Sequence, residues 1–343
     1  MGNRSRIGVW LAAGVIALGM FGIRGVGAAG PADYVKLAPA THEAFVYFDF
    51  AQARNSKMYA DLKTKVIDQQ ASAGLAVVEQ LTGIRLLDDI DVIAASGKLA
   101  QNNEGCLYLK GRWDRQRIQS LLAMNPSYTE IPRPGGKMLG WMDEKKGTMS
   151  YGAFLSDSLI VVGEKAGVEA CLDAPMGKGF SLAEKPSVKA YLADSATSPL
   201  AIVIAVRPPT LPPNLVGKPV IQNLQSVCVA LLQSPETLAM VARAEADSQQ
   251  MASKWLDIVK GVIALGQIQN QVPKLADLAN LATASQRGPI VEVKTQIKTA
   301  EASAFLGQQI DQKRAGRPNV GGMRVRGGGQ GPGQGEKPVP PQW

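Results

Sequence analysis

The sequence has few of the residues that most catalytic and metal sites need. Its 343 residues include one histidine and three cysteines, and aromatic residues make up 6% of the chain. The histidine, His42, is far along the sequence from every cysteine, so no pair has the close spacing of a zinc site. No G-x-S-x-G motif is present to position a serine nucleophile, which argues against a Ser-His-Asp triad built on His42. We therefore interpret His42 as a surface or loop residue and predict no catalytic or metal-binding residues.

The glycine motifs that bind phosphate groups are also missing. Four Gly-Lys pairs occur, but none is followed by the Ser or Thr that a P-loop requires. No G-x-G-x-x-G lies between a predicted strand and a predicted helix. The sequence therefore predicts no nucleotide cofactor, and we expect no other cofactor.

The cysteines Cys106, Cys171 and Cys228 are odd in number and widely spaced. This pattern differs from the disulfide framework of a small secreted scaffold. We interpret all three as small buried apolar residues. One disulfide is compatible with their number, and the spacing leaves open which two would pair.

Three carboxylates, Asp88, Asp89 and Asp91, precede a predicted strand. Carboxylate oxygens are suitable ligands for Ca²⁺, but the spacing and turn glycine of an EF-hand are absent. We interpret the cluster as a solvated turn, with a weak cation site as the alternative.

The first 29 residues have the three parts of a secretory signal peptide. Arg4 and Arg6 are followed by an uncharged apolar run over residues 7–23, and small residues at 26–29 provide a cleavage site. We predict an exported protein, periplasmic or extracellular. A retained N-terminal anchor is the alternative; it would tether the protein to the inner membrane and would be its one membrane contact.

The net charge of +8 is concentrated at the two ends of the chain. Residues 1–29 carry +3 and residues 314–343 carry +4, which leaves +1 for residues 30–313. Binding to nucleic acid needs a basic face that displaces counterions, so we predict no nucleic-acid partner. Residues 315–343 are rich in Gly, Pro, Gln and Arg and are predicted to be a disordered tail.

Between the ends, strand patterns alternate with helical patterns in two units, 30–196 and 197–314. Two segments of the first unit have counterparts in the second: 114–118 resembles 247–251, and 159–172 resembles 290–306. In each pair a strand leads into a helix, and in the first pair an aspartate caps that helix. We therefore predict an internal duplication. The predicted fold class is α+β, with two related halves, each a mainly antiparallel sheet with helices packed on one face.

The expected elements follow from the apolar periodicity and from turn residues. The expected strands cover 44–50, 91–96, 106–113, 128–131, 138–142, 149–155, 158–163, 200–206, 224–232, 237–246, 279–286 and 289–298. The expected helices cover 55–81 with a break near Gly74, 114–124, 166–172, 247–269 and 299–312.

Four segments resemble a broad group of uncharacterised exported bacterial proteins, families of domains of unknown function in which Pro-Ala-Asp follows the signal peptide. The segments are 31–33, 45–50, 82–91 and 110–114. The resemblance covers the first unit well and the second loosely. It implies an exported, duplicated α+β fold and supplies no activity.

We expect an exported, non-enzymatic binding or scaffold protein of the cell envelope, whose partner is another envelope protein or a surface polymer. The alternatives are an envelope hydrolase that uses carboxylates alone and a carrier of an apolar ligand held between sheet and helices. A hydrolase requires a polar cleft with facing carboxylates, and a carrier requires an apolar cavity. A scaffold requires an exposed apolar patch or an open sheet edge.

Deleting residues 315–343 should leave the melting temperature unchanged, because so polar a segment buries too little apolar surface to stabilise the protein. Differential scanning calorimetry of the full and shortened chains measures this. A large fall in melting temperature would show that the tail packs on the folded part.

Overall fold

The computed structural model describes residues 30–315, except 57, 61–62, 64–68, 100–104, 135, 145–146, 174–180, 195–198, 207–222 and 269–278. The predicted signal peptide (1–29), residues 207–222, and residues 316–343 of the predicted tail lie outside the described residues. All statements below concern the described part of the chain.

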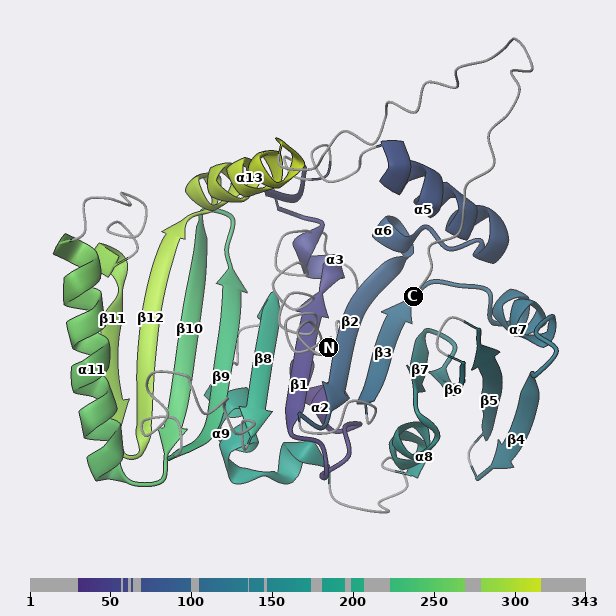
Figure 1. Cartoon of the computed structure of the whole chain (residues 1–343), viewed down its shortest axis with the longest axis horizontal. Helices are drawn as coiled ribbons and strands as arrows, with labels where there is room; N and C mark the ends of the chain where they lie inside the picture. Colours follow the sequence, from purple (N-terminus) through teal and green to yellow (C-terminus); the bar gives the residue numbers. More distant parts are fainter. Residues whose placement is uncertain are drawn as a thin grey trace, which may run out of the picture.

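Twelve strands in this part form a single sheet in which every neighbouring pair is antiparallel (Figure 1). The strand order is β11-β12-β10-β9-β8-β1-β2-β3-β7-β6-β5-β4. The strands are β1 (Ala44–Asp49), β2 (Ile90–Gly97), β3 (Gly105–Gly111), β4 (Thr129–Arg133), β5 (Gly136–Asp143), β6 (Thr148–Ser156), β7 (Leu159–Gly163), β8 (Ala201–Val206), β9 (Leu224–Gln233), β10 (Thr237–Ala246), β11 (Thr283–Arg287) and β12 (Ile290–Lys298).

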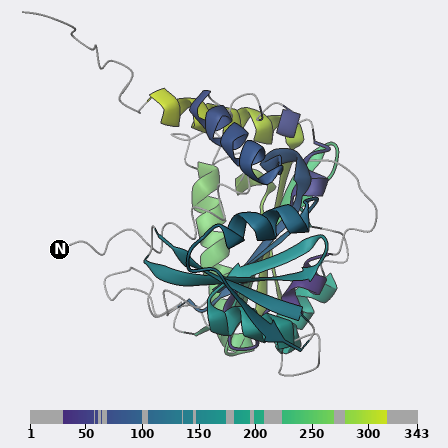
Figure 2. The same ribbon diagram turned by 90° about the vertical axis from the view of Figure 1, so that its right-hand side faces the viewer.

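Helices lie on both faces and at one end of this sheet. They are α2 (Pro31–Val35), α3 (Phe50–Ala53), α5 (Gln69–Thr82), α6 (Leu86–Asp89), α7 (Arg115–Ala123), α8 (Lys165–Asp173), the short 3₁₀ helix η2 (Leu182–Glu184), α9 (Pro186–Asp194), α11 (Gln249–Ile268) and α13 (Thr299–Ala315). In both views α5 and α13 lie at the same end of the sheet, at the top (Figures 1 and 2).

One face, which we call the covered face, carries the main hydrophobic core. Alternate residues of a strand point to the same face, and on the central strands one set of alternate residues is buried. This set includes Phe45 and Tyr47 of β1, Tyr108 of β3 and Ile202 of β8. They pack with residues of α2, α8, η2 and α9, so these helices cover this face.

On the opposite face, helices pack only at the margins of the described sheet. At the β11 edge, Ala252 and Trp255 of α11 pack on Val291 of β12. At the end where β9 turns into β10, Met58 packs with Ala302 of α13. At the same end, Phe48 of β1 and Ala201 of β8 pack with Ala53 of α3 and with Tyr59. The face is therefore anchored at an edge and at an end, while its centre carries no such cluster.

The prediction of an α+β fold is confirmed, and the prediction of a separate sheet for each half is corrected. Strands β1 and β8, one from each predicted unit, pair directly from Ala44↔Ala205 to Phe48↔Ala201. An unpaired strand leaves backbone donors and acceptors open, so joining two such edges removes two aggregation-prone edges at once. The same pairing fuses the two predicted sheets into one, with helices on both faces rather than on one.

The strand order is nearly mirrored about the β1–β8 pair. On one side β3 is followed in the chain by α7 and neighbours β7, which leads into α8. On the other side β10 is followed by α11 and neighbours β12, which leads into α13. The two pairs of similar segments found in the sequence therefore occupy equivalent places in the topology.

Most expected elements are present with small changes at their ends. The expected hairpin turns at Gly288, whose positive φ of 58° favours glycine. The helix expected over 55–81 is seen as α5, which continues through Gly74 without the expected break. Helices α2 and α9 were not predicted, because each is short and has little apolar periodicity.

The N-terminus of α11 corrects a predicted cap. Ser248, rather than Asp247, accepts a hydrogen bond from the Met251 backbone N–H (3.2 Å). The Ser248 hydroxyl in turn donates to the Asp247 carboxylate (3.0 Å). At α7 the predicted cap is confirmed, because Asp114 accepts from the Arg117 backbone N–H (3.0 Å).

Replacing Ser248 with Ala should lower the free energy of unfolding by about 1 kcal/mol, the usual cost of losing a helix cap. Asp247→Ala is the matched control and should cost less, because it removes only a support of the cap. Urea denaturation of both variants measures the difference. An equal or larger loss from Asp247→Ala would contradict this assignment.

Candidate functional site

The most unusual feature of the described surface is the centre of the face opposite the main core. We call this area the open face. We define it by fourteen apolar side chains that share one side of eight neighbouring strands; Thr295 of β12, opposite Met240, is a polar neighbour on the same side. The fourteen residues are Val46, Ile93, Ala95, Leu107, Leu109, Ile160, Val162, Val203, Ala205, Val227, Val229, Met240, Ala242 and Val293.

None of these side chains is fully buried, in contrast to their neighbours on the covered face. Leu107 is 38% exposed and Met240 is 40% exposed. Between Ile93 and Met240 on the same side, Phe48, Ala201 and Leu231 belong to a hydrophobic cluster with Ala53 of α3 and Tyr59, so this row is partly covered. The neighbouring row, which runs from Val162 of β7 to Val293 of β12, has no residue in any hydrophobic cluster of the described residues. The open face is therefore an apolar surface that the described helices cover only in part.

The size of the open face follows from sheet geometry. Eight strands, from β7 to β12, at a spacing of about 4.8 Å span about 34 Å. Each contributes one or two residues at about 6.6 Å intervals along the strand, so the flat area is on the order of 300 Å². That is at the lower end of the range for the largest apolar patch on a typical monomer, and such patches are often functional.

Helix α11 extends this apolar surface at the β11 edge. Its residues Ile258, Val262, Leu265 and Ile268 are 49–73% exposed. The first three are spaced by four and three positions, which places them on one side of the helix. The same helix buries Trp255 against the sheet, and Val262 follows Trp255 by seven positions, so the exposed residues continue the apolar side on which α11 packs and leave it in solvent in the second half of the helix.

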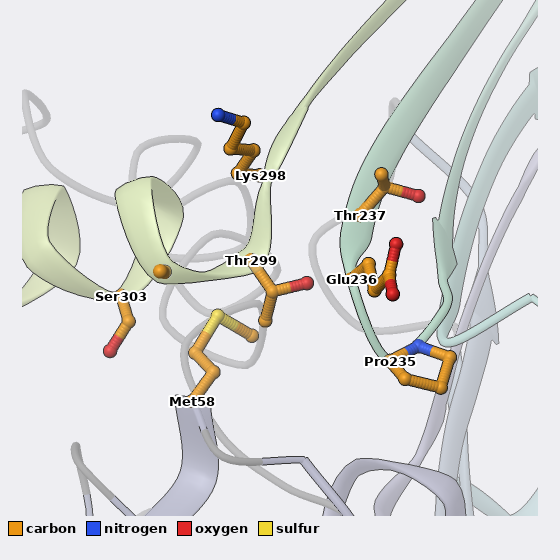
Figure 3. A pocket seen from close by; sticks show the side chains of 8 residues that line it. Met58, Pro235, Glu236, Thr237, Lys298, Thr299 and Ser303 are labelled. Carbon is orange, nitrogen blue, oxygen red and sulfur yellow. The ribbon is translucent and has the colours of Figure 1, made fainter.

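A separate pocket of about 420 Å³ lies where β10, β12 and α13 meet (Figure 3). Its walls include Met58, Glu236, Lys298 and Thr299. The Thr299 hydroxyl is buried without a hydrogen-bond partner, while its backbone N–H donates to the Glu236 carbonyl (2.9 Å). Glu236 and Lys298 place charges of opposite sign at this pocket, so it favours neither an anion nor a cation.

The aspartate cluster predicted as a solvated turn is a set of ion pairs. Asp89 lies 3.1 Å from Arg85 and 3.7 Å from Arg112. Asp91 pairs with Arg54, whose side chain is 9% exposed. Asp88 lies 3.7 Å from Lys63. Each carboxylate of the cluster therefore has a positive partner in the protein, which leaves no cluster of free ligands for a cation.

The pKa of Asp89 shows which influence dominates at this cluster. Burial acts to raise this pKa, but hydrogen bonds from the Arg85 side chain and backbone outweigh burial, so the pKa is lowered. The carboxylate thus stays ionised and joins the two ends of α6, because it accepts from the backbone N–H and the side chain of Arg85, the residue before this helix.

His42 lies in the loop before β1, so its interpretation as a loop residue is confirmed, but it is buried, which corrects its interpretation as a surface residue. It is 3% exposed, and its Nδ1 lies 2.8 Å from the Ser96 hydroxyl. Ser96 lies 3.0 Å from the Tyr108 hydroxyl, which in turn lies 3.2 Å from the Cys171 sulfur. Ser96 and His42 lie inside the core under α2 and α8. This series of polar side chains therefore joins core elements, and none of them lines the pocket between β10, β12 and α13.

The three cysteines are buried, as predicted. Cys106 and Cys171 are neighbours, with their sulfurs 3.6 Å apart, and Cys228 lies on β9. Among the described residues, no group of three or more His, Cys, Asp or Glu side chains is placed to hold a metal ion. In the same part of the chain, no helix has the length and apolarity needed to cross a membrane.

Sequence reasoning missed the open face, although a pattern for it is present. The strand at 201–206 (AIVIAV) is apolar at every position rather than at alternate positions. Such a run is typical of a strand with two apolar faces, but it does not say whether both faces are covered. Which face of the sheet the helices cover depends on tertiary packing, and the sequence pattern of one strand does not determine that packing.

No family model matches the chain, and no curated protein matches it. The resemblance to uncharacterised exported proteins therefore stays a prediction. Among solved structures the chain is similar to TP0453 of Treponema pallidum. Crystal form III gives a TM-score of 0.44 at 7% identity, over 83% of this chain and 100% of that chain. Crystal form I gives 0.42 at 7% identity, over 82% and 98%. A similarity this distant identifies neither a site nor an activity.

Replacing Asp89 with Asn should lower the free energy of unfolding at pH 7 by about 1 kcal/mol, because a charged hydrogen-bond acceptor is lost. The lowered pKa gives a stabilisation that is present above the ordinary aspartate pKa of about 4 and is lost as the pH falls through the folded value. The difference in free energy of unfolding between the wild type and the variant should therefore become smaller below pH 4.

Urea denaturation between pH 3 and pH 7 measures this difference. Asp157→Asn is the matched control, because the Asp157 side chain is fully exposed (100%), and it should change stability little at any pH. A difference for Asp89→Asn that is constant over this range would contradict the ion-pair assignment.

Proposed function

We propose that this protein is an exported, non-enzymatic binding protein that docks a partner protein of the cell envelope on its open face. The single observation that carries the proposal is the continuous apolar surface over eight strands, with Leu107 and Met240 more than one third exposed. Leaving such a surface in water costs free energy in proportion to its area, and a partner with an apolar face recovers that free energy.

The shape of the open face favours a protein over a small apolar ligand. A ligand pocket usually encloses most of its ligand, whereas a sheet face contacts a small ligand from one side. A standard protein interface buries about 800 Å² on each partner, with an apolar centre inside a polar rim. The open face has a suitable area for that centre, and α11 supplies additional apolar side chains beside it.

The hydrolase alternative has less support. It requires two carboxylates that face each other across a cleft, about 5–10 Å apart. The carboxylates of the aspartate cluster are each paired with a basic side chain. In the pocket between β10, β12 and α13, the charged residues of the walls are Glu236 and Lys298. These positions suit ion pairing better than proton transfer.

The cell envelope is proposed as the location because the first 29 residues have the pattern of a signal peptide. We also propose that the two units 30–196 and 197–314 arose by duplication. The mirrored strand order about the β1–β8 pair supports this, because the similar sequence segments fall at equivalent strands and helices.

Site-specific photo-crosslinking in cells that express the full chain tests the docking surface. The photoreactive residue p-benzoylphenylalanine is placed at Leu107 and, in a second chain, at Met240. Both positions should give an adduct with the same envelope protein. Met124 is the matched control, because it is apolar and 78% exposed but follows α7 and is not one of the open-face residues.

A second substitution makes the test specific to the surface. With the crosslinker at Met240, Leu107→Lys should reduce the adduct at least tenfold, because it places a charge inside the apolar centre, while Met124→Lys should leave it unchanged. The proposal fails if no protein adduct forms, if the adduct is a lipid or a second copy of this chain, or if the Met124 control gives the same adduct.

A further inference from the structure

The neighbouring sulfurs of Cys106 and Cys171 have no role in the docking of a partner. Cys106 lies on β3, and Cys171 lies in the last turn of α8, which ends at Asp173. The two sulfurs are 3.6 Å apart, and both residues are buried, at 3% and 0% exposure. Two residues 65 positions apart in the chain are thus brought side by side by the packing of α8 on the covered face.

Glycine at position 167 makes this close approach possible. A Cβ added to Gly167 would lie 2.7 Å from the Cys106 sulfur, closer than such atoms approach in proteins. Gly167 precedes Cys171 by four positions, so the two residues share one side of α8. The absence of a side chain at Gly167 therefore allows the side of the helix that carries Cys171 to lie directly against Cys106.

We propose that Cys106 and Cys171 form a disulfide bond when the chain folds in the presence of a disulfide donor. This assigns the pair that the spacing of the three cysteines leaves open. The inference goes beyond the proposed docking function and does not depend on it.

The third cysteine is excluded by its place in the sheet. Cys228 lies on β9, which is separated from β3 by β8, β1 and β2. Four strand spacings of about 4.8 Å place Cys228 about 19 Å from Cys106 across the sheet. The Cα atoms of a disulfide lie about 4.4–6.8 Å apart, so Cys228 stays a thiol.

The exchange takes place in two balanced steps. A thiolate of Cys171 attacks one sulfur of the donor RSSR, which forms a mixed disulfide and releases RS⁻. Cys106 then loses its proton and attacks the Cys171 sulfur, which forms the Cys106–Cys171 bond and releases a second RS⁻. The protein gives up two electrons and two protons, and the donor becomes two molecules of RSH.

The surroundings of the pair favour Cys171 as the residue that reacts first. Hydrogen bonding with Cys106 and with the Tyr108 hydroxyl lowers the pKa of Cys171, although burial opposes this. Burial raises the pKa of Cys228 to about 12, which keeps that thiol protonated. Since the thiolate is the reacting form, and the last turn of a helix opens more readily than its centre, the donor reaches Cys171 first.

The test is to refold the full chain with a mixture of reduced and oxidised glutathione, and in parallel with excess dithiothreitol. Each sample is then denatured, alkylated with iodoacetamide and weighed by mass spectrometry. The glutathione sample should carry one alkyl group, on Cys228, and a linked peptide pair that contains Cys106 and Cys171. The dithiothreitol sample should carry three alkyl groups and melt several degrees lower, because the cross-link no longer constrains the unfolded chain.

Serine variants give the matched controls. Cys228→Ser should keep the linked peptides and the difference in melting temperature, whereas Cys171→Ser should lose both. The proposal is overturned if natively folded wild-type protein from the glutathione sample carries three alkyl groups, or if Cys228 is found in the linked pair. Because the wild-type mass alone decides between one and three free thiols, the result does not require that any variant folds.

Discussion

The backbone pairing of β1 with β8 is the interaction on which the rest of the described structure depends. It joins strands that lie more than 150 positions apart in the chain and aligns them over Ala44↔Ala205 to Phe48↔Ala201. Every other strand is placed by its distance from this pair, with β2, β3 and β7 on one side and β9, β10 and β12 on the other. Without it, each predicted unit would expose an apolar strand edge in its own sheet.

This pairing also decides what each face of the sheet must do. A one-residue change in its register would exchange the two faces of β8, so Ile202 and Ile204 would leave the main core. The covered face buries large side chains under α2, α8 and α9, and that burial provides most of the hydrophobic stabilisation. The other face is held at its margins by α3, α11 and α13. The fold is therefore complete on one face and leaves a broad apolar area on the other, which is why we place the binding function there.

Most of the secondary structure, the fold class and the antiparallel pairing could be predicted from the sequence. Period-two patterns and turn residues such as Gly288 act locally, so the strands are found within a few residues of their observed ends. The fusion into one sheet could not be predicted, because an apolar strand such as 201–206 does not state which strand it pairs with. The burial of His42 was missed for a similar reason: Ser96 reaches it through the pairing of β1 with β2, and Tyr108 reaches Ser96 through the pairing of β2 with β3.

The candidate site was harder to predict from the sequence than the fold. Catalytic and metal sites leave motifs of characteristic residue types, whereas an apolar surface uses the same residues as a core. Val203 and Ile202 differ little in chemistry, yet one lies on the open face and the other is fully buried. The difference lies in which face the helices cover, and this depends on contacts between distant parts of the chain.

Oxidation of methionines by hydrogen peroxide in the native protein tests most directly whether the open face is uncovered. The side chain of Met240 belongs to that face and is 40% exposed, while Met124 is 78% exposed and Met138 is fully buried. Peptide mass spectrometry over time should show Met240 oxidised at a rate close to that of Met124 and far above that of Met138. If Met240 is instead protected as strongly as Met138, the face is covered in the free protein, and the proposed docking surface is contradicted.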